Sequence, residues 1–189
     1  MSTRESYLPG PAAGASIEKD GGHWTLVLVR DLPHPPARVW QALIEPEHLR
    51  EWAPFDADRS FAPGATVKLT TVGAPTPQIS ETTVKRAEAP KLLEYAWGGG
   101  ELRWQLEPHA GGTRLTLWHA IDRRFIAWGA AGWHISFDVL ERLLAGEPIG
   151  RTAGVDAMKF DGWRRLVAEY ARQFGVEPPK WPPKAAPKS

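Results

Sequence analysis

Residues 122–146, DRRFIAWGAAGWHISFDVLERLLAG, constrain the fold most, because they predict one long helix that is apolar on more than one side. One apolar stripe recurs at steps of three and four residues: Ile126, Ala130, Trp133, Phe137, Leu140 and Leu144. A second stripe lies beside it: Trp128, Ile135, Val139 and Leu143. The face left for water consists of His134, Asp138, Glu141 and Ala145. Such a helix must be covered on two sides, and a sheet that curves around it would do this.

The residues before this helix predict mostly strands, with short helices at 37–44 and 46–51. Strands are expected in the segments of alternating or β-branched residues between Gly and Pro turns: 23–31, 66–72, 79–87, 92–97, 101–107 and 113–120. The tight turns between the last strands favour an antiparallel meander. A final helix is expected over about 156–174, where it can cover the long helix or the outer face of the sheet.

The length of 189 residues favours one domain with extensions. Residues 1–21 are rich in Gly, Ala, Ser and Pro and predict a flexible arm, and residues 22–175 predict the domain. Residues 176–189 predict a flexible tail rich in Pro and Lys. Trp181 in that tail either anchors it to the body of the molecule or docks a partner.

Charge and composition exclude several classes of function. Lys plus Arg number 23 and Asp plus Glu 22, so the net charge of +1 gives no general attraction to nucleic acid or to an anionic membrane. No apolar run reaches eighteen residues and no secretory signal is present, so we expect no membrane span and a cytoplasmic location. Cysteine is absent, and the six histidines lack metal-site spacing, so neither a metal nor a cofactor is expected.

An aromatic patch on the inner face of the predicted meander is the candidate site. Because strand side chains alternate between faces, Tyr95 and Trp97 share one face with each other, as do Leu102 and Trp104. The expected ligand-binding residues come from three strands and the long helix: Tyr95, Trp97, Leu102, Trp104, Leu117, His119, Trp133 and Phe137. These residues either fill a core or line a pocket, and apolar walls with a few polar points are typical of small-molecule sites.

Two histidines are candidates for a catalytic role. His119 has the ordinary pKa of a general base, but no neighbour in the sequence would orient it, so a core or rim position is the alternative. His134 precedes Asp138 by one helical turn and is expected on the polar face as an ordinary i, i+4 pair. Catalytic residues therefore stay unknown.

Three segments resemble one branch of the SRPBCC superfamily, also called START-like or helix-grip proteins. They are LPHPPARVWQALIEPEHLREW (32–52), APKLLEYAWGGGELRWQLEPHAGGTRLTLWH (89–119) and GWHISFDVLERLLAGEP (132–148). The branch is that of homologues of the activator of heat-shock-protein-90 ATPase. The resemblance implies an α+β fold in which a curved antiparallel sheet wraps around a long C-terminal helix, with an extra terminal helix here. No catalytic residue carries over by motif.

The leading hypothesis is a cytoplasmic protein that binds a small hydrophobic or aromatic molecule between the sheet and the helix centred on Trp133. An enzyme of the polyketide cyclase, aromatase or hydrolase type is one alternative, and it would need His119 or a carboxylate in the pocket. A protein-interaction module of the co-chaperone kind, acting in stress response, is another. A homodimer also stays open, because Trp128 and Trp163 add apolar surface to the helices.

Overall fold

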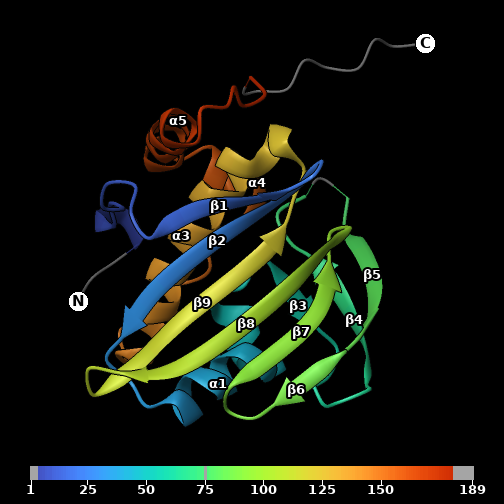
Figure 1. The fold of residues 1–189 in the computed structure, drawn as a ribbon. Helices are drawn as coiled ribbons and strands as arrows, with labels where there is room; N and C mark the ends of the chain where they lie inside the picture. Colours follow the sequence, from blue (N-terminus) through green and yellow to red (C-terminus); the bar gives the residue numbers. More distant parts are fainter. Residues whose placement is uncertain (1–3, 75, 181–189) are drawn as a thin grey trace.

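The computed structural model describes residues 4–74 and 76–180 of the chain (Figure 1). Its strands are β1 (Ala15–Asp20), β2 (His23–Leu32), β3 (Phe55–Ala57), β4 (Thr66–Thr71), β5 (Gln78–Thr83), β6 (Arg86–Glu88), β7 (Leu92–Trp97), β8 (Gly100–His109) and β9 (Gly112–Ala120). Its helices are η1 (Arg4–Ser6), α1 (Pro36–Ile44), α2 (Pro46–Trp52), η2 (Arg123–Phe125), α3 (Ile126–Leu144), α4 (Gly154–Met158) and α5 (Asp161–Phe174).

The strands form two antiparallel sheets that adjoin each other. The larger has six strands in the order β1-β2-β9-β8-β7-β6, and the smaller has three in the order β3-β4-β5. The predicted meander is present as β7, β8 and β9. Beyond the paired strands, the amide of Ala96 donates to Thr82 Oγ1 at 3.0 Å and that of Lys85 to the carbonyl of Glu94 at 2.9 Å. The first bond joins β5 to β7, and the second joins the segment between β5 and β6 to β7, so the two sheets are connected along this edge.

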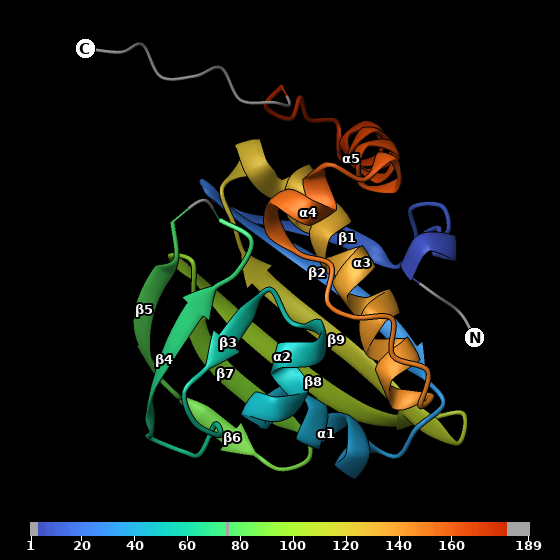
Figure 2. The same cartoon turned by 180° about the vertical axis from the view of Figure 1, so that it is seen from behind.

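The helices α1, α2 and α3 lie together on one face of the large sheet (Figure 2). The inward strand residues occupy the predicted face: Leu102 lies opposite His119 and Trp104 opposite Leu117, all at least nine-tenths buried. This buried face packs against α3, and α5 covers α3 from the other side. The predicted α+β helix-grip fold is therefore confirmed.

The long helix α3 spans Ile126–Leu144, which is shorter than the predicted 122–146. Asp122 accepts a hydrogen bond from the amide of Arg124 and so caps the 3₁₀ turn η2, which leads directly into α3. After Leu144 the chain leaves the helix through Gly146, whose φ of +79° suits a residue without a Cβ. The 19 residues of α3 include buried side chains from both predicted stripes, among them Trp133, Phe137, Ile135 and Val139.

The prediction of a flexible arm over residues 1–21 differs from the structure. Ala15–Asp20 form β1, which pairs with β2 along its whole length. The preceding residues are bonded to α5, since Tyr170 Oη donates to the carbonyl of Ala13 and Glu169 accepts from the amide of Ala12. The Gly- and Pro-rich composition hid these contacts, because they are made by backbone groups rather than by an apolar pattern. The division into one domain over 22–175 stays a prediction.

The polar face of α3 is also covered, which corrects the expectation that His134 sits in water. His134 is 5% exposed, and its Nδ1 lies 2.7 Å from Tyr170 Oη. Asp138 accepts hydrogen bonds from Tyr7 Oη at 2.5 Å and from Arg30 Nη1 at 2.7 Å. The arm and α5 thus supply polar partners for this face, so polar residues alone did not predict exposure.

Three smaller differences concern element boundaries. The expected last helix is two helices, α4 and α5, which are separated at Lys159 and Phe160. The expected strand over 79–87 is divided into β5 and β6. The short strand β3 was not predicted, because three residues are too few for a periodic pattern. Trp181 lies outside the described residues.

Within the described part of the chain, no helix is long and apolar enough to cross a membrane. The same residues contain no group of three or more His, Asp or Glu side chains arranged to hold a metal ion.

Candidate functional site

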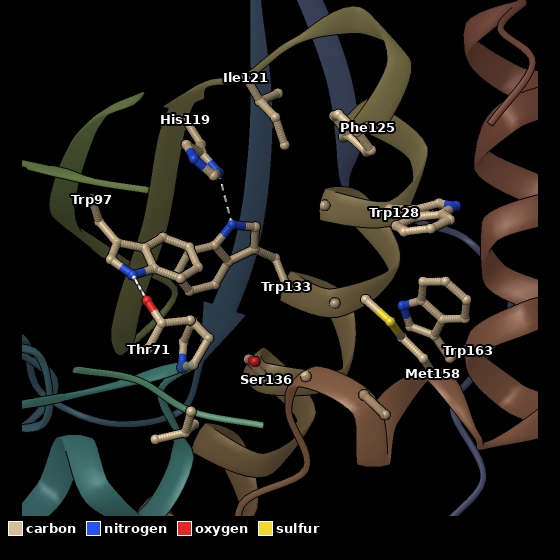
Figure 3. Close-up of a pocket in the computed structure, with 16 residues that line it drawn as sticks. Thr71, Trp97, His119, Ile121, Phe125, Trp128, Trp133, Ser136, Met158 and Trp163 are labelled. Atoms are coloured by element: carbon tan, nitrogen blue, oxygen red, sulfur yellow. Dashed lines mark hydrogen bonds between the residues drawn. The ribbon is translucent and has the colours of Figure 1, made fainter. Parts of the chain in front are cut away.

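A cavity of about 230 Å³ lies between the two sheets and the helices α3, α4 and α5 (Figure 3). Its floor and walls come from segments far apart in the sequence: Pro54, Thr71, Val72, Trp97, His119, Ile121, Phe125, Trp128, Gly129, Gly132, Trp133, Ser136, Gly154, Ala157, Met158 and Trp163. Phe125 is 39% exposed and lines the cavity, so the rim lies near the start of α3.

Glycines on α3 help to make the space. A Cβ built on Gly132 would meet no atom within 4 Å, so this turn of the helix faces open volume. At Gly129 a Cβ would meet the side chain of Ile121 at 2.8 Å. The small residues of the sequence GAAG therefore let the cavity reach the backbone of the helix.

Close contact between two other glycines positions the outer wall. A Cβ on Gly73, just after β4, would lie 2.7 Å from Gly154 Cα at the start of α4. The amide of Val155 donates to the carbonyl of Gly73 at 2.9 Å, and Arg151 forms an ion pair with Asp56 at 2.6 Å. These contacts join the connection between α3 and α5 to the small sheet and bring Met158 to the cavity.

Four tryptophans form most of the apolar wall. Trp97 and Trp133 meet edge to face with ring centroids 5.8 Å apart, and Trp128 and Trp163 do the same at 5.5 Å. Trp97 Nε1 donates to Thr71 Oγ1 at 3.0 Å, which satisfies the polar edge of that indole. Trp163 is 2% exposed and packs on Trp128, so its surface is covered within the chain, whereas Trp128 is partly buried. Dimerisation stays a prediction.

His119 is bonded to the central tryptophan of the helix. Trp133 Nε1 donates to His119 Nδ1 at 3.0 Å, so a neutral imidazole here carries its proton on Nε2. Burial lowers the pKa of His119 to about 4, because the charged ring would lose its hydration. Near neutral pH the ring is therefore uncharged, and the lone pair of Nδ1 is already used.

The eight sequence-predicted site residues divide into two groups. Trp97, His119 and Trp133 line the cavity. Five others belong to the packed core and do not line it: Tyr95, Leu102, Trp104, Leu117 and Phe137, each no more than 1% exposed. Tyr95 Oη accepts a hydrogen bond from Trp104 Nε1 at 3.2 Å, which explains how these polar edges are tolerated in the core. The sequence predicted which face of each strand points inward, but not which residues on that face line the cavity.

Several lining residues were not predicted. Thr71 and Val72 come from the small sheet, and Met158 and Trp163 come from the two terminal helices. Ser136 lies on α3, where its polar side chain gave no reason to place it inward. Gly129 and Gly132 were the available signal in the sequence. Small residues on a broadly apolar helix indicate that another segment packs closely there or that a cavity lies beside the helix.

The described lining residues include neither an acidic nor a basic side chain, His119 being neutral. No carboxylate therefore orients His119, and the histidine is a weak base. The site has the properties of an apolar binding cavity with a few polar groups, rather than those of an active site with a general acid and a general base.

A curved sheet closed by one long helix, with an uncharged cavity between them, defines a helix-grip protein. The sequence profile described as "Activator of Hsp90 ATPase homolog 1-like protein" matches residues 33–145, which is more than half of the chain. The chain therefore belongs to this family.

Solved structures show the same fold. A conserved protein of unknown function from Enterococcus faecalis, EF2215, is 16% identical, with a TM-score of 0.64 over 86% of this chain and 92% of that one. CalU16 from Micromonospora echinospora is 18% identical, with a TM-score of 0.61 over 85% of this chain and 93% of that one. DynU16, a protein in the dynemicin biosynthetic locus, is 23% identical, with a TM-score of 0.58 over 67% of this chain and 49% of that one. No curated protein matches the sequence.

Proposed function

We propose that this protein binds a small hydrophobic or aromatic molecule in the cavity beside Trp133. The observation that carries the proposal is an uncharged cavity walled by Trp97, Trp128, Trp133 and Trp163. Burying an aromatic molecule against such a wall gains roughly 25 cal/mol for each Å² of apolar surface removed from water, before the costs of association. The similarity to DynU16, from a biosynthetic locus, is compatible with a small organic ligand.

An enzymatic role is less well supported. The cyclase or hydrolase alternative requires a base or a carboxylate at the cavity. His119 uses Nδ1 as an acceptor for Trp133, and its pKa of about 4 leaves little driving force to take up a proton. The described lining residues offer no carboxylate in its place.

A protein-interaction role predicts an exposed apolar surface. Among the described residues, the large exposed hydrophobic side chains belong to four separate segments: Leu8, Val29, Ile79 and Phe125. Among them Phe125 lies at the rim of the cavity. The co-chaperone alternative is tested by measuring whether the chain stimulates the ATPase of a heat-shock protein from the same cell.

Binding is tested by filling the cavity. In Gly132→Leu the new side chain enters open volume, and we expect at least about a tenfold loss of affinity for any aromatic ligand. The helix itself should form readily, since leucine favours a helix by nearly 1 kcal/mol over glycine. Quenching of tryptophan fluorescence by a panel of aromatic metabolites and lipids measures the affinity.

Ala168→Leu is the matched control, because it adds leucine at an exposed position on α5 away from the cavity. This variant should bind as the natural protein does. Equal binding by Gly132→Leu and Ala168→Leu would place the ligand elsewhere and contradict the proposal.

A further inference from the structure

We infer that the ligand is an uncharged molecule of one or two fused rings that carries a hydroxyl or carbonyl group, and that Ser136 selects this group. The inference rests on the proposed function and specifies its ligand class. It follows from three properties of the cavity, namely a serine in its lining whose hydroxyl has no hydrogen bond to another described residue, a small volume and the absence of charge among the described lining residues.

Ser136 carries the unused polar group. The residue is 2% exposed and lines the cavity, and Figure 3 shows it beside Trp133 on the cavity side of α3. Within the described residues, its hydroxyl forms no hydrogen bond with another residue. The residue faces the cavity, where a ligand group can replace water as the partner of the hydroxyl, with a net gain of about 0.5–1.5 kcal/mol for one neutral hydrogen bond.

Two neighbouring polar groups each form one hydrogen bond inside the protein. Thr71 Oγ1 accepts from Trp97, and His119 Nδ1 accepts from Trp133. Because these bonds satisfy both indole groups, the two tryptophans present mainly apolar ring surface to a ligand. Ser136, with no hydrogen bond to another described residue, can both donate to and accept from a ligand, whereas His119 offers only its Nε2 N–H.

The volume limits the size of the ligand. A cavity of about 150 Å³ holds benzene. At about 230 Å³ this cavity has room for a second fused ring, but not for a long acyl chain or a steroid nucleus. Drug-sized ligands usually occupy about 300–1,000 Å³.

The absence of charge limits the chemistry of the ligand. A carboxylate in the cavity would lose its hydration without gaining a cation, since the described lining contains neither Lys nor Arg. Burial also keeps His119 neutral, so the imidazole offers no positive charge in exchange. Neutral hydroxyl and carbonyl compounds avoid this cost and still pair with Ser136.

Calorimetric titration near pH 7 with naphthalene, 2-naphthol, 2-naphthoate and decanoate tests the inference. We expect 2-naphthol to bind about three- to tenfold more tightly than naphthalene, as one neutral hydrogen bond predicts. It should also bind at least about tenfold more tightly than 2-naphthoate, and decanoate should not bind measurably.

Ser136→Ala removes the selecting group without filling the cavity. In this variant the preference for 2-naphthol over naphthalene should disappear, while naphthalene affinity stays unchanged. Ser80→Ala is the control, because Ser80 is exposed on β5 and should leave every affinity unchanged. The free energy of unfolding of Ser136→Ala should not fall, since the hydroxyl has no hydrogen bond to another described residue and alanine favours the helix.

The outcomes separate the two levels of the proposal. If naphthalene and 2-naphthol bind equally, or Ser136→Ala keeps the preference, the role of Ser136 is wrong although the cavity still binds. If 2-naphthoate or decanoate binds best, the ligand class is wrong. If none of the four compounds binds to the natural protein, the proposed binding function itself fails together with the inference.

Discussion

His119 illustrates how one residue acquires its properties from its surroundings. Its place on the inner face of β9 follows from strand alternation, and Leu102 lies opposite it on β8. Its bond to Trp133 comes from a helix that follows in the chain and crosses the sheet. The histidine is consequently a neutral acceptor that orients the indole, whereas the sequence alone left both a general base and a core or rim position open.

The burial of His119 predicts a pH dependence of stability. Its pKa falls from 6.5 to about 4 on folding, so between these values the unfolded chain binds a proton that the folded chain does not. His119 therefore does not lower the free energy of unfolding above about pH 6.5. As the pH falls from 6.5 toward 4, this free energy decreases by up to about 3 kcal/mol, at 1.36 kcal/mol per unit of pKa. Urea unfolding between pH 4 and pH 7 measures it.

The variant His119→Asn keeps an acceptor for Trp133 but does not titrate in this range. Its stability should vary less with pH than that of the natural protein. Burial also lowers the pKa of His134, so part of the dependence should remain. If the free energy of unfolding of His119→Asn varies with pH as steeply as that of the natural protein, the His119 ring is protonated equally in the folded and unfolded states.

At the scale of elements, the N-terminal segment and α5 form one unit through Tyr170. Its hydroxyl donates to the carbonyl of Ala13 and accepts from the amide of the same residue at 3.2 Å. The hydroxyl also meets His134 on α3. The side chain of Tyr170 on α5 thus contacts both the segment before β1 and the helix α3.

Tyr170→Phe should separate the arm from α5. Removing the hydroxyl leaves the buried Nδ1 of His134 and the backbone groups of Ala13 without this partner, so we expect a loss of about 1–3 kcal/mol in the free energy of unfolding. Hydrogen exchange should accelerate selectively for the amides of residues 12–17. Tyr95→Phe removes another buried hydroxyl from the core and should destabilise the chain without this local effect. Unchanged exchange of the arm in Tyr170→Phe would contradict the proposed connection.

At the scale of the whole molecule, the contact between Gly73 and Gly154 joins the small sheet to the connection between the terminal helices. Both backbones have positive φ, +74° at Gly73 and +59° at Gly154. A Cβ at Gly154 would lie 2.6 Å from Gly73 Cα, closer than side chains approach in folded proteins. The wall of the cavity therefore depends on two residues that lie 81 positions apart in the printed sequence.

Gly154→Ala should displace this wall. Gly150→Ala is the matched control, because Gly150 has a φ of +81° but no atom within 4 Å of the added Cβ. Alanine costs about 1 kcal/mol at either site through its backbone conformation, and only Gly154→Ala adds the steric clash. We expect a larger loss of unfolding free energy and weaker ligand binding in Gly154→Ala. Equal losses in the two variants would show that the contact is not needed.

The sequence by itself determined the order of the main elements, the long helix α3 and the inward faces of β7, β8 and β9. These features follow from local periodicity and from turn chemistry, which each segment carries without reference to the others. Family resemblance added the way in which the sheet curves around the helix. Together they placed Trp97, His119 and Trp133 at one site.

Only the tertiary structure decided which inward residues reach open space and which are packed. Tyr95 and Trp97 share a face of one strand, yet Tyr95 is 1% exposed in the core and Trp97 lines the cavity. The difference arises because α4, α5 and the small sheet close over one end of the sheet, and their positions depend on long-range contacts such as Gly73 with Gly154. The same physical reason explains the burial of His134 and the order of the N-terminal arm, since a polar residue or a Gly-rich segment becomes buried only when a distant segment supplies its hydrogen-bond partners.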